Sequence, residues 1–239
     1  MNTHHQEILG LIASLSGEAT QHTFSDSYLG TKHPRFAIDA PTMRQIAKEW
    51  MRDHKDLSAR ELQTLLTSLI EAKSATEKVM AGMLMDASTK AQRQFPPKIF
   101  DTWLNHLEGW AEVDSICSGR FTVTEIPRAW PEWKKLLLQF SKDKNIHKRR
   151  AAMVLLCSPI RKVDDADMAK TAFQIILRLK SEKEILITKA ISWLLRSMTV
   201  KFKKEVSTFV DEHEDSLPKI AVRETRVKLL TGKKTVRNI

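Results

Sequence analysis

Hydrophobic and polar residues follow the 3.6-residue period of amphipathic α-helices almost from one end of the chain to the other. In the segment SARELQTLLTSLIEA, one stripe comprises Leu62, Leu65, Leu66 and Leu69. No stretch of any length shows the two-residue period of a half-buried strand. Further amphipathic stretches lie near residues 97–107, 110–118, 131–141, 145–157, 164–180, 182–198, 201–212 and 218–230. The pattern predicts an all-α protein.

Capping signals mark where several of these helices begin. Ser58 is followed three residues later by Glu61, and Ser74 by Glu77, which is the spacing of a capping box. Two capped helices separated by a very short turn form a helical hairpin. Another helix is predicted in PTMRQIAKEWMRDH, with Pro41 at its first position.

The connections between predicted helices are short and polar, such as KDKN and KSEKE. Helical hairpins that recur about every 35–45 residues are typical of HEAT or armadillo repeats. We therefore predict HEAT-like repeats that form a curved α-α superhelix, or solenoid, with a concave basic groove. An irregular helical bundle is the alternative. No linker divides the chain, so we expect one domain over residues 1–239, with a basic tail over about 231–239.

Composition excludes some functional classes. Hydrophobic residues make up 42% of the 239 residues, which is ordinary for a globular protein. Glycine occurs only 7 times, fewer than many tight turns would need. Neither G-x-x-x-x-G-K-[ST] nor G-x-G-x-x-G occurs, which argues against the common nucleotide-binding folds.

The charge balance indicates the kind of partner. The chain has 39 Lys+Arg against 29 Asp+Glu, a net charge of +10. Such a surplus favours a polyanion, and both nucleic acid and a membrane surface qualify. A basic soluble protein without such a partner is the plainer alternative.

Cysteine and histidine usage predicts neither a metal nor a cofactor. Cys117 and Cys157 each lie within an apolar helical pattern, which is typical of buried free thiols in a reducing compartment. No CxxC pair or His/Cys cluster has the spacing of a zinc site.

The sequence also bears on localisation. The N-terminal segment MNTHHQEILGLIASL lacks the basic and long apolar regions of a signal peptide. No run approaches the roughly 18 apolar residues that span a membrane. We expect a cytoplasmic protein, nucleoid-associated if bacterial, with no membrane partner.

The segment GWAEVDSI places a carboxylate in an apolar setting. Trp110 and Asp114 stand four residues apart and so share a helix face with Val113 and Cys117. Burying an unpaired charge is costly, so such a carboxylate should have a partner or a purpose. A half-exposed aspartate that caps or pairs locally is the alternative.

The segment NIHKRRAAMVLL brings cations to a helix start. Lys144, Lys148 and Arg149 form a predicted basic face beside Asn145, the expected N-cap. Cations there oppose the helix dipole, which is tolerable if a phosphate docks. Arg150 edges onto the apolar face, where its guanidinium could act as a fixed donor or simply extend to solvent.

The segment ITKAISWLLRSM carries an indole off its buried stripe. That stripe comprises Ile187, Ile191, Leu194 and Met198. Trp193 lies on another face, between Lys189 and Arg196. The indole could make cation–π contacts only, or could serve as a platform for a nucleobase or sugar beside phosphate-binding charges.

These three segments resemble those that build the active site of AlkD-type DNA glycosylases, the DNA alkylation repair family. The resemblance runs from about residue 25 to about residue 230. The segment YLGTKHPRFAIDAPTMRQIAKEW also resembles the family's N-terminal segment, in which a G-x-x-x-P-x-x-R loop enters a helix. Four motifs in this order on a basic, all-helical chain are much more specific than any one alone.

The resemblance implies a function and a role for individual residues. The family releases N3- and N7-alkylated purines such as 3-methyladenine and 7-methylguanine from duplex DNA, without cofactor or metal, and leaves the base stacked. Asp114 matches the catalytic carboxylate, and Trp110 matches an aromatic that packs on the deoxyribose. Arg150 matches an arginine that holds a nearby phosphate, and Trp193 matches the second aromatic wall.

Further DNA contacts are expected from one segment and one set of cations. Thr42 and Arg44 lie in the N-terminal segment that resembles the family. The cations are expected to share one concave basic surface and comprise Lys144, Lys148, Arg149, Lys189 and Arg196. The N-terminal segment departs from the family in two ways: Asp39 stands where an uncharged residue is expected, and the loop over residues 31–38 is longer.

Three functional hypotheses follow. The first is an alkylpurine DNA glycosylase, a monomer whose partner is double-stranded DNA containing alkylated bases. The second is a non-catalytic protein of the same fold that binds damaged or branched DNA. The third is a protein-interaction scaffold whose basic groove holds an acidic partner. Release of a free base separates the first from the second, and DNA binding separates both from the third.

Overall fold

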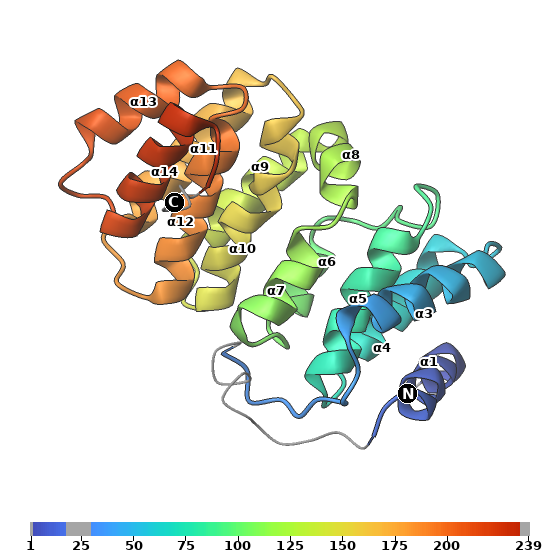
Figure 1. Ribbon diagram of the computed structural model, residues 1–239. Helices are drawn as coiled ribbons and strands as arrows, with labels where there is room; N and C mark the ends of the chain where they lie inside the picture. The colour runs from blue at the N-terminus through green and yellow to red at the C-terminus, as the bar shows by residue number, and fades with distance from the viewer. Residues whose placement is uncertain (1, 18–29, 235–239) are drawn as a thin grey trace. The chain divides into compact units, whose positions relative to one another are not determined.

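The computed structural model describes residues 2–17 and 30–234 and is helical throughout (Figure 1). These residues form 13 α-helices and one short 3₁₀ helix, and none of them lies in a β-strand. The all-α prediction is therefore confirmed. Most of the predicted basic tail, residues 235–239, lies outside the described residues. Among the described helices, none combines the length and apolar character needed to cross a membrane.

The chain divides into two compact units, residues 1–121 and residues 122–239. The single domain, the curved superhelix and its concave groove concern both units together and stay predictions. Within each unit alternate helices form one layer and the intervening helices pack against it, which is compatible with a helical-repeat fold.

The first unit is built around one central helix. Its helices are α1 (Thr3–Ser14), α3 (Ala40–Asp53), α4 (Ala59–Ile70), α5 (Ala75–Ala87), α6 (Ile99–Trp103) and α7 (Gly109–Cys117). Helix α5 packs against α3, α4 and α7, and α1 packs against α3 and α4. The layer α3–α5–α7 therefore runs through the unit, with α4 and α1 beside it.

Capping chemistry fixes the starts of α4 and α5 where the sequence predicted. Ser58 Oγ accepts from the Glu61 N–H at 3.3 Å, and the Ser58 N–H donates to the Glu61 carboxylate at 2.8 Å. Ser74 and Glu77 form the same pair of bonds, each 3.2 Å long. Both predicted capping boxes are confirmed, and each satisfies backbone donors that a helix start leaves unpaired.

Helix α1 was not predicted, and a buried histidine holds it in place. Asn2 caps it by accepting from the His5 N–H at 2.8 Å. The His5 ring bridges the Glu77 carboxylate at 2.8 Å and Ser68 Oγ at 2.7 Å, on α5 and α4. Burial raises the pKa of Glu77, but hydrogen bonds from His5 and Ser74 outweigh burial and lower it. A buried, paired carboxylate thus docks α1 on the unit.

The second unit has two layers of helices. Its elements are α8 (Phe121–Arg128), α9 (Trp130–Phe140), α10 (Ile146–Cys157), a 3₁₀ helix (Pro159–Arg161), α11 (Ala166–Leu179), α12 (Ile185–Met198), α13 (Lys203–Glu212) and α14 (Lys219–Thr231). Helix α12 lies between α10 and α14 (Figure 1), and α9, α11 and α13 pack outside that layer. Successive helical pairs begin about 36 residues apart, within the predicted spacing.

Helix α10 runs through the core of the second unit. All its residues from Arg150 to Cys157 are buried, so it shows almost no amphipathic pattern. Cys157 lies here and Cys117 lies in α7; both are buried free thiols, as predicted. Helix α8 was not predicted, because β-branched residues and an internal Pro127 disguise its helical pattern.

Candidate nucleic-acid interface

Helix α7 presents Trp110 and Asp114 at the edge of a buried face. Val113 and Cys117 on that face are fully buried, while Trp110 and Asp114 are half-buried. The helix begins at Gly109, whose φ of 65° lies in the left-handed region that favours glycine. The expected side-by-side placement of indole and carboxylate on one helix is confirmed, whereas their catalytic roles stay predictions.

A second acid on the same helix, Glu112, was missed from the sequence. Its side chain is 0% exposed. It accepts hydrogen bonds from Thr31 Oγ1 at 2.6 Å and from the Glu108 N–H at 2.7 Å, and it contacts His33 Nδ1 at 3.0 Å. These partners compensate for burying a carboxylate. Glu112 therefore fastens the loop at residues 31–33 to the first turn of α7.

The long loop over residues 31–38 is held at further points. The Lys32 N–H donates to the Glu108 carboxylate at 3.1 Å. Pro34 O accepts from the Ala75 N–H at 2.8 Å, and the Phe36 N–H donates to Thr76 Oγ1 at 3.0 Å. The loop thus spans from the start of α7 to the start of α5.

Asp39 has a structural reason to be acidic. It is the N-cap of α3, and its Oδ1 accepts from the Thr42 N–H at 2.8 Å. Hydrogen bonds from the Thr42 side chain and backbone lower the pKa of Asp39. Pro41 occupies the second helical position, one residue later than predicted. Arg44 is exposed one turn into the helix, and Thr42 is half-buried.

Gly82 of α5 lets α7 approach closely. A Cβ atom built on Gly82 would overlap the backbone carbonyl of Ser115, the residue after Asp114. No other amino acid fits this contact unless the two helices move apart. The contact therefore fixes how closely α7 packs on α5 beside Asp114.

In the second unit, Arg150 is buried and fixed. Its side chain belongs to α10, is 5% exposed as a residue, and donates from Nη1 to the carbonyl of Leu186 at 2.6 Å. The alternative in which Arg150 simply extends to solvent is therefore wrong. The expected inward orientation is confirmed, but its role toward a phosphate stays a prediction.

Helix α12 has one stripe that is not buried. Leu186, Trp193 and Arg196 are half-buried on it, and Lys189 is exposed. Trp193 therefore lies off the buried stripe, as predicted. Arg150 reaches this stripe at Leu186, two helical turns before Trp193, which is about 10 Å along the axis. The structure thus brings Arg150 to the helix that carries Trp193.

The expectation that five cations share one exposed basic surface needs correction. Lys148 is only 7% exposed, with Nζ 3.7 Å from the Asp143 carboxylate. Arg149 makes two bonds to Glu182, at 2.8 and 3.1 Å. Lys144 and Lys189 are the exposed members of the set.

Arg149 and Arg196 are both engaged within the unit. Arg149 Nη1 also donates to the carbonyls of residues 143 and 144, at 2.9 and 2.8 Å, so this arginine braces the loop before α10. Arg196 lies 3.3 Å from the Glu224 carboxylate of α14. Burial lowers the pKa of Arg196, and the Glu224 charge opposes that shift. These acids stand far away in sequence, so periodicity gave no signal of them.

The site residues thus fall into two groups. Trp110, Asp114, Thr42 and Arg44 belong to the layer α3–α5–α7 of the first unit. Arg150, Trp193 and the five cations belong to the second unit, on or just before α10 and on α12. Within each unit the helices that carry the main site residues lie in one layer. That the two groups meet around DNA stays a prediction.

These features define a class of protein: an all-helical repeat protein that carries an indole–carboxylate pair on one helix layer. A model of the DNA alkylation repair enzyme family matches residues 13–229, so this chain belongs to that family. It is similar in structure to a predicted DNA alkylation repair enzyme from Enterococcus faecalis, with a TM-score of 0.71 and 18% identity. That match covers 90% of this chain and 99% of the other. No curated protein matches the chain.

Substitution of Trp193 tests whether its side chain serves at the surface or in the core. Trp193→Ala should weaken binding of alkylated duplex by about 5–100-fold, the worth of one base–aromatic contact. Leu194→Ala, on the buried stripe, should instead cost about 2–5 kcal/mol of stability. Melting temperature and binding affinity of both variants measure the difference. A loss of stability in Trp193→Ala as large as that in Leu194→Ala would contradict the surface assignment.

Lys144 offers a test of phosphate contact. Lys144→Gln should weaken binding to all duplexes alike and lower the slope of log affinity against log salt by about 0.9, the value for one phosphate. Lys204→Gln removes an exposed charge from α13 in the outer layer and should leave the slope unchanged. Titrations at several salt concentrations give both slopes, and equal slopes for the two variants would refute the contact.

Proposed function

We propose that this member of the DNA alkylation repair enzyme family is a DNA glycosylase. Its substrates are positively charged N3- and N7-alkylated purines in duplex DNA, released by hydrolysis of the N-glycosidic bond. The observation that carries the proposal is the half-buried Trp110–Asp114 pair on α7. The buried Glu112 and the close contact at Gly82 support it, because both hold that helix rigidly.

The reaction requires little from the protein besides a fixed negative charge. An alkylated purine already carries a positive charge, so it leaves without a strong general acid. As the bond to the sugar breaks, the sugar gains oxocarbenium character. The Asp114 carboxylate would stabilise that cation and would orient the water that attacks it. The oxygen of that water then bonds to the anomeric carbon, and one proton of the water passes to solvent.

The remaining residues have positioning roles in this proposal. The Trp110 face would pack on the deoxyribose and stabilise its developing charge. Trp193 would form a second wall, with Lys189 beside it on α12 for a phosphate. Arg150, held at Leu186, would present its guanidinium to the phosphate near the lesion.

Release of the base tests the proposal directly. Duplex DNA containing 7-methylguanine is incubated with excess protein, and the free base is measured by chromatography. The proposal expects stoichiometric release that depends on protein concentration. Binding of the duplex without release of any alkylpurine would favour the non-catalytic alternative, a protein for damaged or branched DNA. Absence of DNA binding would favour a scaffold for an acidic protein.

A further inference from the structure

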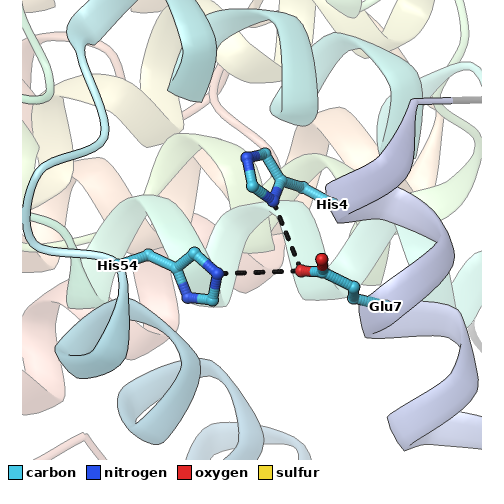
Figure 2. Close-up of side chains that lie close together, drawn as sticks. All are labelled: His4, Glu7 and His54. Carbon is cyan, nitrogen blue, oxygen red and sulfur yellow. Dashed lines mark hydrogen bonds and ion pairs between the residues drawn. The ribbon is translucent and has the colours of Figure 1, made fainter.

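Two histidines and a glutamate converge at the start of the chain. His4 and Glu7 project from α1 toward His54, which follows α3 (Figure 2). The Glu7 Oε2 atom lies 3.3 Å from His4 Nδ1 and 3.7 Å from His54 Nε2. One potential ligand atom from each residue lies within 4.8 Å of the other two. Sequence spacing gave no sign of this cluster, because His54 lies far along the chain from the other two.

Local structure explains why the three side chains meet. His4 and Glu7 are three residues apart on α1, so they share one face. His54 is the C-cap of α3, and its ring Nδ1 lies 2.8 Å from the Trp50 carbonyl. A carbonyl only accepts, so Nδ1 carries the proton and donates it. The Nε2 lone pair of His54 therefore faces Glu7, which is how metal-binding histidines are commonly held.

Trp50 holds the cluster in shape. Its indole stacks on the His54 ring, with centroids 3.8 Å apart and planes 12° apart. The His4 ring meets Trp50 edge-on at 5.4 Å and His54 edge-on at 5.3 Å. The indole N–H donates to Glu7 Oε2 at 3.4 Å. Each of the three ligand side chains is thus oriented by a contact outside the cluster.

The separations of the ligand atoms suit a small bound cation. The 3.7 Å separation between Glu7 Oε2 and His54 Nε2 is too long for a hydrogen bond. Ligands about 2.0–2.1 Å from a tetrahedral zinc ion lie about 3.3–3.4 Å apart. The two separations from Glu7 Oε2, 3.3 Å to His4 and 3.7 Å to His54, lie at or slightly above that value.

We propose that His4, Glu7 and His54 form a binding site for a divalent zinc-class cation. The donors are two imidazole nitrogens and one carboxylate oxygen, a set suited to Zn²⁺, with water completing the coordination. When Nδ1 of His4 binds the ion, its proton moves to Nε2 and the ring stays neutral. The ion places a charge of +2 beside one carboxylate. Its coordinate bonds replace the hydrogen bond between His4 and Glu7.

The site would act as a clamp between α1 and the end of α3. It joins the start of α1 to the end of α3, which lie far apart in the sequence, so coordination would restrain α1. Thr42, at the other end of α3, lies about 18 Å away along the helix axis. The clamp is therefore distinct from the proposed DNA contacts, and it stands whether or not the protein is a glycosylase.

The test measures metal binding by the full-length protein. After treatment with chelator, Zn²⁺ is titrated by calorimetry, and Co²⁺ is added separately to record the visible absorption of a tetrahedral site. We expect one tight equivalent of Zn²⁺. At about 100 times its Kd, Zn²⁺ should raise the melting temperature by about 5–10 °C.

Matched variants locate the bound ion. Glu7→Gln and His54→Gln should each lose the tight equivalent and the rise in melting temperature. His106→Gln is the control, because His106 is an exposed histidine 3.9 Å from Glu71 and should leave both unchanged. Glu7 is exposed, so Glu7→Gln remains informative even if His54→Gln does not fold. Absence of tight binding in the unaltered protein, or undiminished binding in Glu7→Gln, would overturn the proposal.

Discussion

Replacing Asp114 by asparagine is expected to slow release of 7-methylguanine by about 10²–10³-fold while the protein stays folded. The amide keeps the shape of the side chain but removes the negative charge that would face the oxocarbenium-like sugar. Affinity for duplex DNA should stay the same or rise, because a negative charge near phosphates is lost. Single-turnover release, measured with the melting temperature, gives rate and stability from the same sample.

Glu112 provides the contrast for Asp114 within one helix. Glu112→Gln replaces one carboxylate oxygen by an amide NH₂, so either Thr31 Oγ1 or the Glu108 N–H loses its acceptor and stability should fall by about 1–3 kcal/mol. If Asp114 were also only a structural carboxylate, Asp114→Asn would behave in the same way. A folded Asp114→Asn protein that releases base at the unaltered rate would remove Asp114 from the mechanism.

Gly82→Ala is expected to damage both stability and base release, although alanine normally favours a helix. The added methyl group would overlap the Ser115 carbonyl, so α5 and α7 must separate. Overpacking of this kind costs about 1–3 kcal/mol. Because Asp114 precedes Ser115, a shift of about 1 Å should also slow release roughly 10²-fold. Thermal melting and single-turnover assays measure the two effects.

Gly10→Ala is the matched control for Gly82→Ala. Gly10 also lies inside a helix, α1, but a Cβ built on it meets nothing within 4 Å. This substitution should therefore stabilise the protein by about 0.5–1 kcal/mol and leave release unchanged. Stabilisation by Gly82→Ala as well would show that the α5–α7 contact does not constrain α7.

Local signals in the sequence were sufficient for most of the fold. The caps at Ser58, Ser74 and Asn145 form within three residues of the chain, so spacing alone located them. The predicted helix near 97–107 is only the five-residue α6, because Pro96 and Pro97 precede it and its turns are irregular. Helices α1 and α8 were not predicted, and in α8 the internal Pro127 disguises the helical pattern.

The site was less predictable, because its decisive contacts are long-range. Trp110 and Asp114 could be paired from their four-residue spacing. The bond from Thr31 to Glu112 spans 81 positions, and the bond from Arg149 to Glu182 spans 33. Periodicity assigns a residue to a face but names no partner on another element. For that reason the cations looked exposed in the sequence although most have acidic neighbours.

In the proposed complex with DNA, the acids beside Lys148, Arg149 and Arg196 would compete with phosphates for those cations. A carboxylate tethered next to a cation acts at an effective concentration in the millimolar range or above. A phosphate must displace it before that cation contributes to binding. Duplexes that approach in the wrong register leave these internal pairs intact and gain little from them. The net charge of +10 would therefore overstate the attraction for arbitrary DNA, and a backbone held in one particular placement would gain most from these cations.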